Sequence, residues 1–175
     1  MIYWMKPLPK AEINSDEFEP FIKNVWFRNN FMWFVYALQI NLVFWSMWVG
    51  VWSFANPFFE IMLLVITFLV HELLHVVVIY PLGNISFTYS NLFFWLNTDA
   101  VMTKKKFLLF VSLPFVTLTV LPGIISLFLP KDISMYFKSI AWMNSIIAGA
   151  DIINILLILA KPRESIFYRG YIKRC

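Results

Sequence analysis

The sequence is poor in charge, in histidine and in cysteine, and these shortages narrow what the protein can be. Charged residues make up 14% of the 175 positions, and the chain has two His and one Cys. Because Cys175 has no partner within the chain, an internal disulfide is excluded. The sequence also lacks internal repeats, low-complexity tracts and Gly-rich loops that cradle phosphate groups. Few residues are therefore left that could act in catalysis or bind a metal ion.

What the chain has in excess is apolar and aromatic side chains. Hydrophobic residues make up 61% of the sequence, with 19 Phe and 8 Trp. Ordinary soluble domains are about 45–50% apolar and about 25% charged. A soluble fold of this length could not bury so much aromatic surface, so we expect one compact integral membrane domain.

Four segments are long and apolar enough to cross a bilayer, which takes about 20 residues each. They are residues 31–54, 58–80, 107–129 and 136–160. We therefore expect an all-α membrane protein with four transmembrane helices. Residues 1–30 would form an N-terminal arm at the cytoplasmic interface, 31–160 the membrane domain and 161–175 a basic cytoplasmic tail.

The basic residues are distributed unevenly about these four segments. Of the 14 Lys and Arg, 12 lie before the first segment, between the second and third, or after the fourth. The positive-inside rule then predicts that both termini are cytoplasmic. We interpret these side chains as topology determinants and lipid-headgroup contacts, not as a nucleic-acid surface.

The second apolar segment contains His71-Glu72-Leu73-Leu74-His75. On a helix, the His-Glu-x-x-His pattern places both imidazoles on one face, one turn apart. Two such imidazoles can hold a metal ion, and the Glu can act as general base on water. Chance matches are common on the solvated faces of soluble helices. Inside an apolar segment, however, three polar side chains need partners, which favours metal-assisted hydrolysis.

Asp151 is the candidate for a third metal ligand. Apart from Glu72, it is the only acidic residue inside the four segments and away from their ends. The second and fourth segments run in the same direction, and His71 and Asp151 both lie about 13 Å from the same end. Because the chain has no other His, a third protein ligand must be a carboxylate or an amide. The alternative is that Asp151 makes a hydrogen bond between packed helices.

On a continuous fourth helix, Asn144 lies on the same face as Asp151, two turns away. The small residues Ala141, Ser145 and Gly149 recur every four positions on an adjoining face, which lets helices approach closely in lipid. We expect this helix to pack on the second segment and to present Asp151 to the metal.

Residues 85–90 alternate between apolar and polar side chains, and 92–96 follow as a second apolar run. This pattern favours a short β-hairpin between the second and third helices, or equally an amphipathic loop on the headgroups. A hairpin at this place could bind an extended substrate by strand addition.

An intramembrane His-Glu-x-x-His with a late Asp on another helix resembles the site-2 protease type of zinc metalloprotease. The size, the four apolar segments and Ala150-Asp151 more closely resemble the small bacterial membrane family described as "putative zincin peptidase", over about residues 58–169. The resemblance implies that His71, His75 and Asp151 bind Zn²⁺ and that Glu72 is the catalytic base. It also implies that Asn144 acts near the reacting carbonyl as an oxyanion stabiliser, and that the protein lies in the bacterial cell membrane.

The sequence therefore predicts an intramembrane zinc metalloprotease that hydrolyses membrane-embedded or membrane-adjacent peptides. Its partners would be the lipid bilayer and a peptide or membrane-protein substrate. Two alternatives stay open: a non-catalytic metal-binding adaptor, and a small ion or proton carrier. His and carboxylate ligands suit zinc but also bind other divalent ions.

Overall fold

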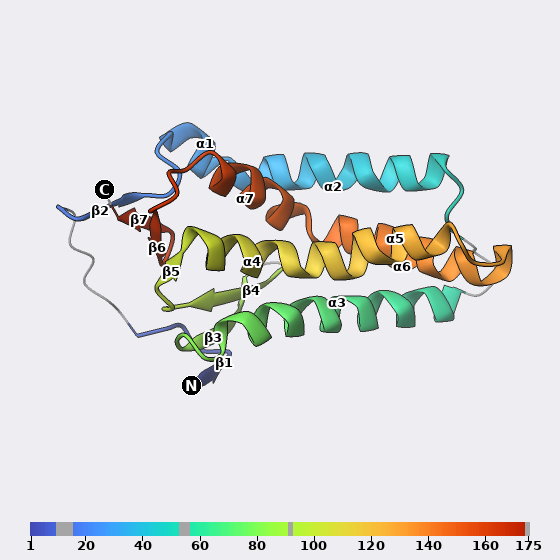
Figure 1. The fold of residues 1–175 in the computed structure, drawn as a ribbon, viewed down its shortest axis with the longest axis horizontal. Coiled ribbons are helices and arrows are strands. Elements are labelled where there is room, and N and C mark those ends of the chain that lie inside the picture. The colour runs from blue at the N-terminus through green and yellow to red at the C-terminus, as the bar shows by residue number, and fades with distance from the viewer. Residues whose placement is uncertain (10–15, 53–56, 91–92, 174–175) are drawn as a thin grey trace.

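The computed structural model describes residues 1–9, 16–52, 57–90 and 93–173. The long helices run side by side as a bundle, and two small sheets and both ends of the chain lie at one end of it (Figure 1). The helices are α1 Val25–Asn29, α2 Phe31–Trp48, α3 Pro57–Ile79, α4 Lys104–Phe115, α5 Leu121–Ser126, α6 Lys131–Ile147 and α7 Gly149–Leu159. A π-helical turn, Val116–Val120, joins α4 to α5.

Within the described residues, three helical segments are long and apolar enough to cross a membrane: α2, α3 and the run Lys104–Ser126. Together α6 and α7 pass the same test, but they are bent by 65°. Both chain ends lie at the same end of the bundle, so the chain runs along the bundle an even number of times (Figure 1). After α2, α3 and the run Lys104–Ser126, the bent pair α6–α7 returns the chain to that end. Three of the four predicted segments are therefore present as single candidate spans and the fourth as a bent pair, and which side of a membrane holds the termini stays a prediction.

The expectation of a continuous fourth helix is wrong. The helix is interrupted at Ala148, between α6 and α7, so Asn144 and Asp151 belong to different helices. The break leaves the Ile146 carbonyl free to accept a hydrogen bond of 3.0 Å from the Gln39 side chain on α2. Gly149 permits this approach, because a Cβ atom there would lie 2.8 Å from the Gln39 side chain. The bend is thus held by a contact from a distant helix.

The expected hairpin is present. Strands β3 (Ile85–Ser90) and β4 (Phe93–Thr98) pair antiparallel, with Ile85 opposite Thr98. Strand β1 (Ile2–Trp4) pairs parallel to β3, which gives the strand order β1-β3-β4. The N-terminal residues therefore cover one edge of the hairpin.

A second sheet shows that the fold is mostly helical but not all-α as predicted. Its strands are β2 (Phe18–Pro20), β7 (Tyr171–Lys173), β6 (Ile166–Tyr168) and β5 (Met102–Thr103), in that spatial order. Strands this short show no alternation that a sequence pattern could reveal. The β6–β7 turn is Arg169-Gly170, with φ of 47° and 79°, which suits a two-residue type I′ hairpin. The sheet ties the N-terminal arm to the C-terminal tail, and the predicted domain boundaries stay untested.

Asp99 connects the two sheets. Its carboxylate accepts hydrogen bonds from the Asn84 backbone at 2.6 Å and side chain at 2.8 Å, and it lies 3.7 Å from the Arg169 guanidinium. Burial raises the pKa of Asp99, but the Asn84 hydrogen bonds and the Arg169 charge outweigh burial and hold this pKa below its ordinary value. The contribution of Asp99 to stability is therefore complete above the pKa of an unfolded Asp. It is lost only as pH falls through the lowered folded pKa.

Two apolar clusters attach the sheets to the helices. Phe21, Val111, Ile158, Phe167 and Ile172 form the first cluster, around the second sheet. The second cluster is formed by Ile79, Ile85, Ala100 and Met102, at the base of the hairpin. Phe107 and Phe110 of α4 pack against both clusters. The helix α4 is therefore held between the two sheets, at the end of the bundle where the sheets lie.

We predict that Gly83→Ala lowers the free energy of unfolding by about 1–3 kcal/mol, the usual cost of overpacking. A Cβ atom at Gly83 would lie 2.7 Å from the Asp99 carboxylate and 2.8 Å from the Ala100 nitrogen, and backbone cannot move aside cheaply. Thermal unfolding in detergent measures the effect. Gly123→Ala, inside α5 and with no atom within 4 Å of the added Cβ, is the control and should not lower the melting temperature. Equal melting temperatures for the two variants would contradict the prediction.

Candidate metal centre

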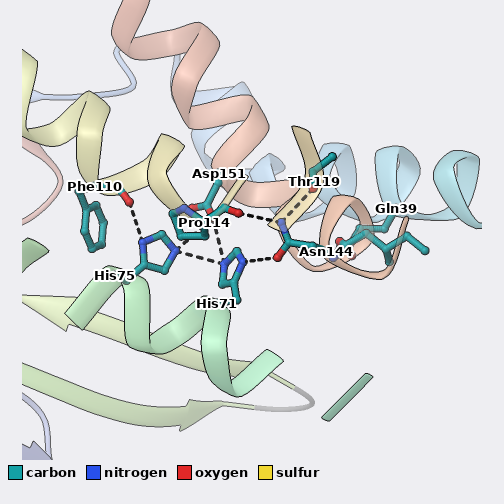
Figure 2. A network of polar contacts seen from close by, with 9 residues as sticks. Gln39, His71, His75, Phe110, Pro114, Thr119, Asn144 and Asp151 are labelled. Atoms are coloured by element: carbon teal, nitrogen blue, oxygen red, sulfur yellow. Dashed lines mark hydrogen bonds and ion pairs between the residues drawn. The ribbon is translucent and has the colours of Figure 1, made fainter. Parts of the chain in front are cut away.

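Three side chains that the sequence singled out converge between α3 and α7. His71 Nε2 and His75 Nε2 lie 3.2 Å apart, and Asp151 Oδ2 lies 3.2 Å from the first and 3.1 Å from the second. Both imidazoles are buried, at 3% and 5% exposure. Figure 2 shows the two rings reaching from α3 towards Asp151 on α7. Among the described residues, no other group of three such side chains is placed to share a metal ion.

The spacing of these donor atoms fits a tetrahedral zinc site. Zinc bonds of about 2.0–2.1 Å in tetrahedral geometry separate neighbouring ligand atoms by about 3.3 Å. The three observed separations of 3.1–3.2 Å are close to that value. Two imidazole nitrogens and one carboxylate oxygen are also a ligand set that catalytic zinc sites use, with a fourth position left open. The residues present therefore fit the metal in type and in spacing.

The hydrogen bonds on the far side of each ring determine which nitrogen faces the centre. His71 Nδ1 lies 2.9 Å from Asn144 Oδ1, and His75 Nδ1 lies 2.8 Å from the Phe110 carbonyl. Since carbonyl oxygens only accept, each Nδ1 carries the proton and donates it, which turns the Nε2 lone pair inward. Two lone pairs and a carboxylate then face one another and repel unless a cation lies among them. A metal ion or an extra proton on one His can supply this charge.

Asn144 is fully buried at 0% exposure, and its amide is completely used. Besides accepting from His71, it donates to the Pro114 carbonyl at 3.1 Å and to the Thr119 hydroxyl at 3.0 Å. The oxyanion role expected for Asn144 requires a free N–H, and both of its amide hydrogens are donated here. That role stays an untested prediction without geometric support. The geometry instead makes Asn144 a positioning residue for His71.

Pro114 is the residue whose contribution the sequence did not reveal. It has no N–H, so it cannot bond the Phe110 carbonyl four residues earlier in α4. That carbonyl is the acceptor for His75, while the Pro114 carbonyl holds Asn144 (Figure 2). The π-helical turn that follows carries Thr119, and such turns are frequent at functional sites. A proline inside an apolar segment was the available signal, but nothing in the sequence linked it to the histidines.

The cluster opens onto a cavity of about 450 Å³, here called the metal cavity. Glu72 lines this cavity next to His71, as a general base would need to, and its catalytic role stays a prediction. Asn154, one turn beyond Asp151 on α7, lines the cavity as well. Asp151 lies in the first turn of α7, where the positive end of the helix dipole stabilises a carboxylate. The break in the fourth span thus places an acid where its charge is favoured.

Comparison with known proteins agrees with this geometry. A family model described as "putative zincin peptidase" matches residues 64–166, which is more than half of the chain. The matched stretch includes His71, Glu72, His75, Asn144 and Asp151. No curated protein and no solved structure matches the chain.

We predict that Asn144→Ala weakens zinc binding about 10–100-fold, the usual effect of removing a residue that orients a metal ligand. Without Asn144, His71 loses the acceptor that fixes its tautomer and ring orientation. Competition with a zinc-binding dye measures the affinity of the purified protein in detergent. Asn41→Ala is the matched control, because Asn41 bonds only to its own helix at the Ala37 carbonyl. Unchanged affinity in a folded Asn144→Ala protein would contradict the assignment.

The same measurement on Pro114→Ala tests the role of the freed carbonyl. The new N–H at position 114 would compete with His75 for the Phe110 carbonyl, so we expect the zinc affinity to fall although no ligand is changed. Pro122→Ala is the control, since Pro122 lies at the start of α5, eight residues further along the chain, and does not line the metal cavity. An affinity loss of similar size in both variants would point to general disturbance of the helix instead.

Proposed function

Since the chain belongs to the family described as "putative zincin peptidase", we propose that it is a zinc-dependent peptidase acting on membrane-embedded or membrane-adjacent peptides. The observation that carries the proposal is the convergence of His71, His75 and Asp151 at tetrahedral spacing. The two histidines lie on α3, a helix apolar enough to span a membrane. A closed structural site would have a fourth protein ligand, whereas this cluster faces a cavity.

Different residues have different roles in the proposed hydrolysis. When bound, zinc supplies Lewis acidity, which polarises a carbonyl and lowers the pKa of water to about 7. His71, His75 and Asp151 hold the ion, and the hydrogen bonds at the two Nδ1 atoms keep the rings in place. Glu72 takes the proton from the attacking water and passes it to the leaving amine.

Water reaches the site from the end of the bundle that carries the sheets. His75 lies four residues before the end of α3 at Ile79, so it is about 6 Å from that end. The metal cavity is also lined there by Leu96 of β4. A short path for water is needed because each turnover consumes one water molecule.

The hairpin gives the substrate a place to bind in extended form. A peptide must unwind locally, because a helix hides its carbonyls from attack. Strand β1 covers β3, and within the described residues the second edge of β4 has no strand partner. A substrate strand added to β4 would lie beside Leu96, which lines the metal cavity. Strand addition at β4 therefore accounts for how an unfolded segment is brought to the site.

Metal content is the first test of this function. We expect one zinc ion per chain in purified wild type, and loss of it in His75→Ala and in Asp151→Ala, because each removes one of three ligands. Elemental analysis of the detergent-purified proteins measures this. Metal-free wild type that is well folded under metal-replete conditions would refute the proposal and favour proton transfer or packing.

The catalytic half of the proposal is tested by Glu72→Gln. We expect this variant to keep its zinc but to lose peptide cleavage by at least about 100-fold, because proton transfer by a general base contributes 10²–10⁴-fold. Cleavage of fluorescent transmembrane peptides selected with wild type measures activity. Glu60→Gln, which changes the other acid of α3, is the matched control. Biological function that survives Glu72→Gln would favour an adaptor or a carrier.

A further inference from the structure

A second cavity of about 540 Å³ adjoins the metal cavity. Leu96, Phe107 and Phe110 line both cavities, so the two share a wall. Phe110 is also the residue whose carbonyl holds His75. The second cavity extends from this wall to Asn97 on β4 and to Arg169 in the β6–β7 turn, and therefore lies between the two sheets.

The walls of the second cavity suit an apolar, uncharged occupant. Its inner surface is formed by aromatic and aliphatic residues of the two apolar clusters, among them Phe21, Met102 and Phe167. Among the described residues that line it, Arg169 alone is charged, and Asp99 pairs with this guanidinium. The positive charge described there is therefore already offset by a carboxylate, which favours an uncharged occupant over an anionic one.

The rim of the cavity already holds polypeptide outside regular secondary structure, namely the protein's own N-terminal segment after β1. Pro7 and Leu8 line the cavity. On either side of them, the Lys6 carbonyl accepts a hydrogen bond from the Ser86 hydroxyl, and the Pro9 carbonyl accepts one from Arg169. The rim thus offers side-chain donors to backbone carbonyls while the interior takes apolar groups. This combination suits an extended peptide with large apolar side chains.

We infer that the second cavity is a substrate subsite, which takes an apolar side chain of an extended peptide whose scissile bond lies in the metal cavity. The inference rests on the proposed function. A peptide that occupies both cavities passes Leu96 and Phe110, so the residue in the subsite lies on one side of the cleaved bond. The subsite would make the enzyme prefer large aliphatic or aromatic residues at that position.

Two hydroxamates of different size test the subsite by binding rather than by turnover. Acetohydroxamate chelates the metal and is too small to leave the metal cavity, whereas a dipeptide hydroxamate with Leu and Phe side chains extends beyond it. Isothermal titration of zinc-loaded full-length protein in detergent gives both dissociation constants. Thr88→Trp and Asn97→Trp add bulk to the second cavity only, because neither residue lines the metal cavity.

We expect each Trp variant to bind the dipeptide hydroxamate about tenfold or more weakly, the equivalent of one excluded apolar side chain. Acetohydroxamate should bind both variants as it binds wild type. Val101→Trp, at an exposed position outside the cavity lining, is the matched control and should change neither constant. Unchanged affinity for the dipeptide hydroxamate in both cavity variants would overturn the subsite. Failure of wild type to bind even acetohydroxamate would instead overturn the proposed function.

Discussion

The structure depends on supplying hydrogen-bond partners to two imidazole rings that are buried inside a bundle of apolar helices. Each ring can direct its Nε2 atom towards Asp151 only if its Nδ1–H finds an acceptor on the other side. The third span supplies one acceptor directly, through the Phe110 carbonyl that Pro114 leaves free. It supplies the other indirectly, because the Pro114 carbonyl holds Asn144, which in turn holds His71. A proline that weakens one helix thus orients two imidazoles on another.

The break in the fourth span solves a related problem for the carboxylate. A straight helix would carry Asp151 in mid-helix, where the helix dipole offers little to a negative charge. The break at Ala148 places Asp151 in the first turn of α7, and Gln39 of α2 bonds the carbonyl of Ile146 that the break exposes. The irregular backbone at this break is tolerated because a side chain of the protein bonds the carbonyl that the break exposes. The two departures from regular helix, at Pro114 and at Ala148, therefore both bear on how His71, His75 and Asp151 are placed.

The sheets extend the site beyond the helices. The hairpin contributes Leu96 to the wall between the two cavities, and the second sheet closes the far side of the second cavity through the Arg169 turn. The ion pair between Asp99 and Arg169 links the two sheets, and Arg169 lines that cavity. The helices bring His71, His75 and Asp151 together, and the two sheets form the walls of the cavity that adjoins them.

The sequence by itself predicted the long apolar helices, the hairpin as one of two possibilities, and the three side chains that the structure brings together. Apolar runs and the alternation at 85–90 are local patterns, and the rarity of His and of intramembrane acids left Asp151 as the partner. Only the tertiary structure decided the roles of Asn144, Pro114 and Gln39, because each acts through a hydrogen bond between helices far apart in the chain. The second sheet was not predicted from the sequence for the same reason. Its strands of two or three residues are stabilised by pairing across the molecule, and local propensity carries no record of such pairing.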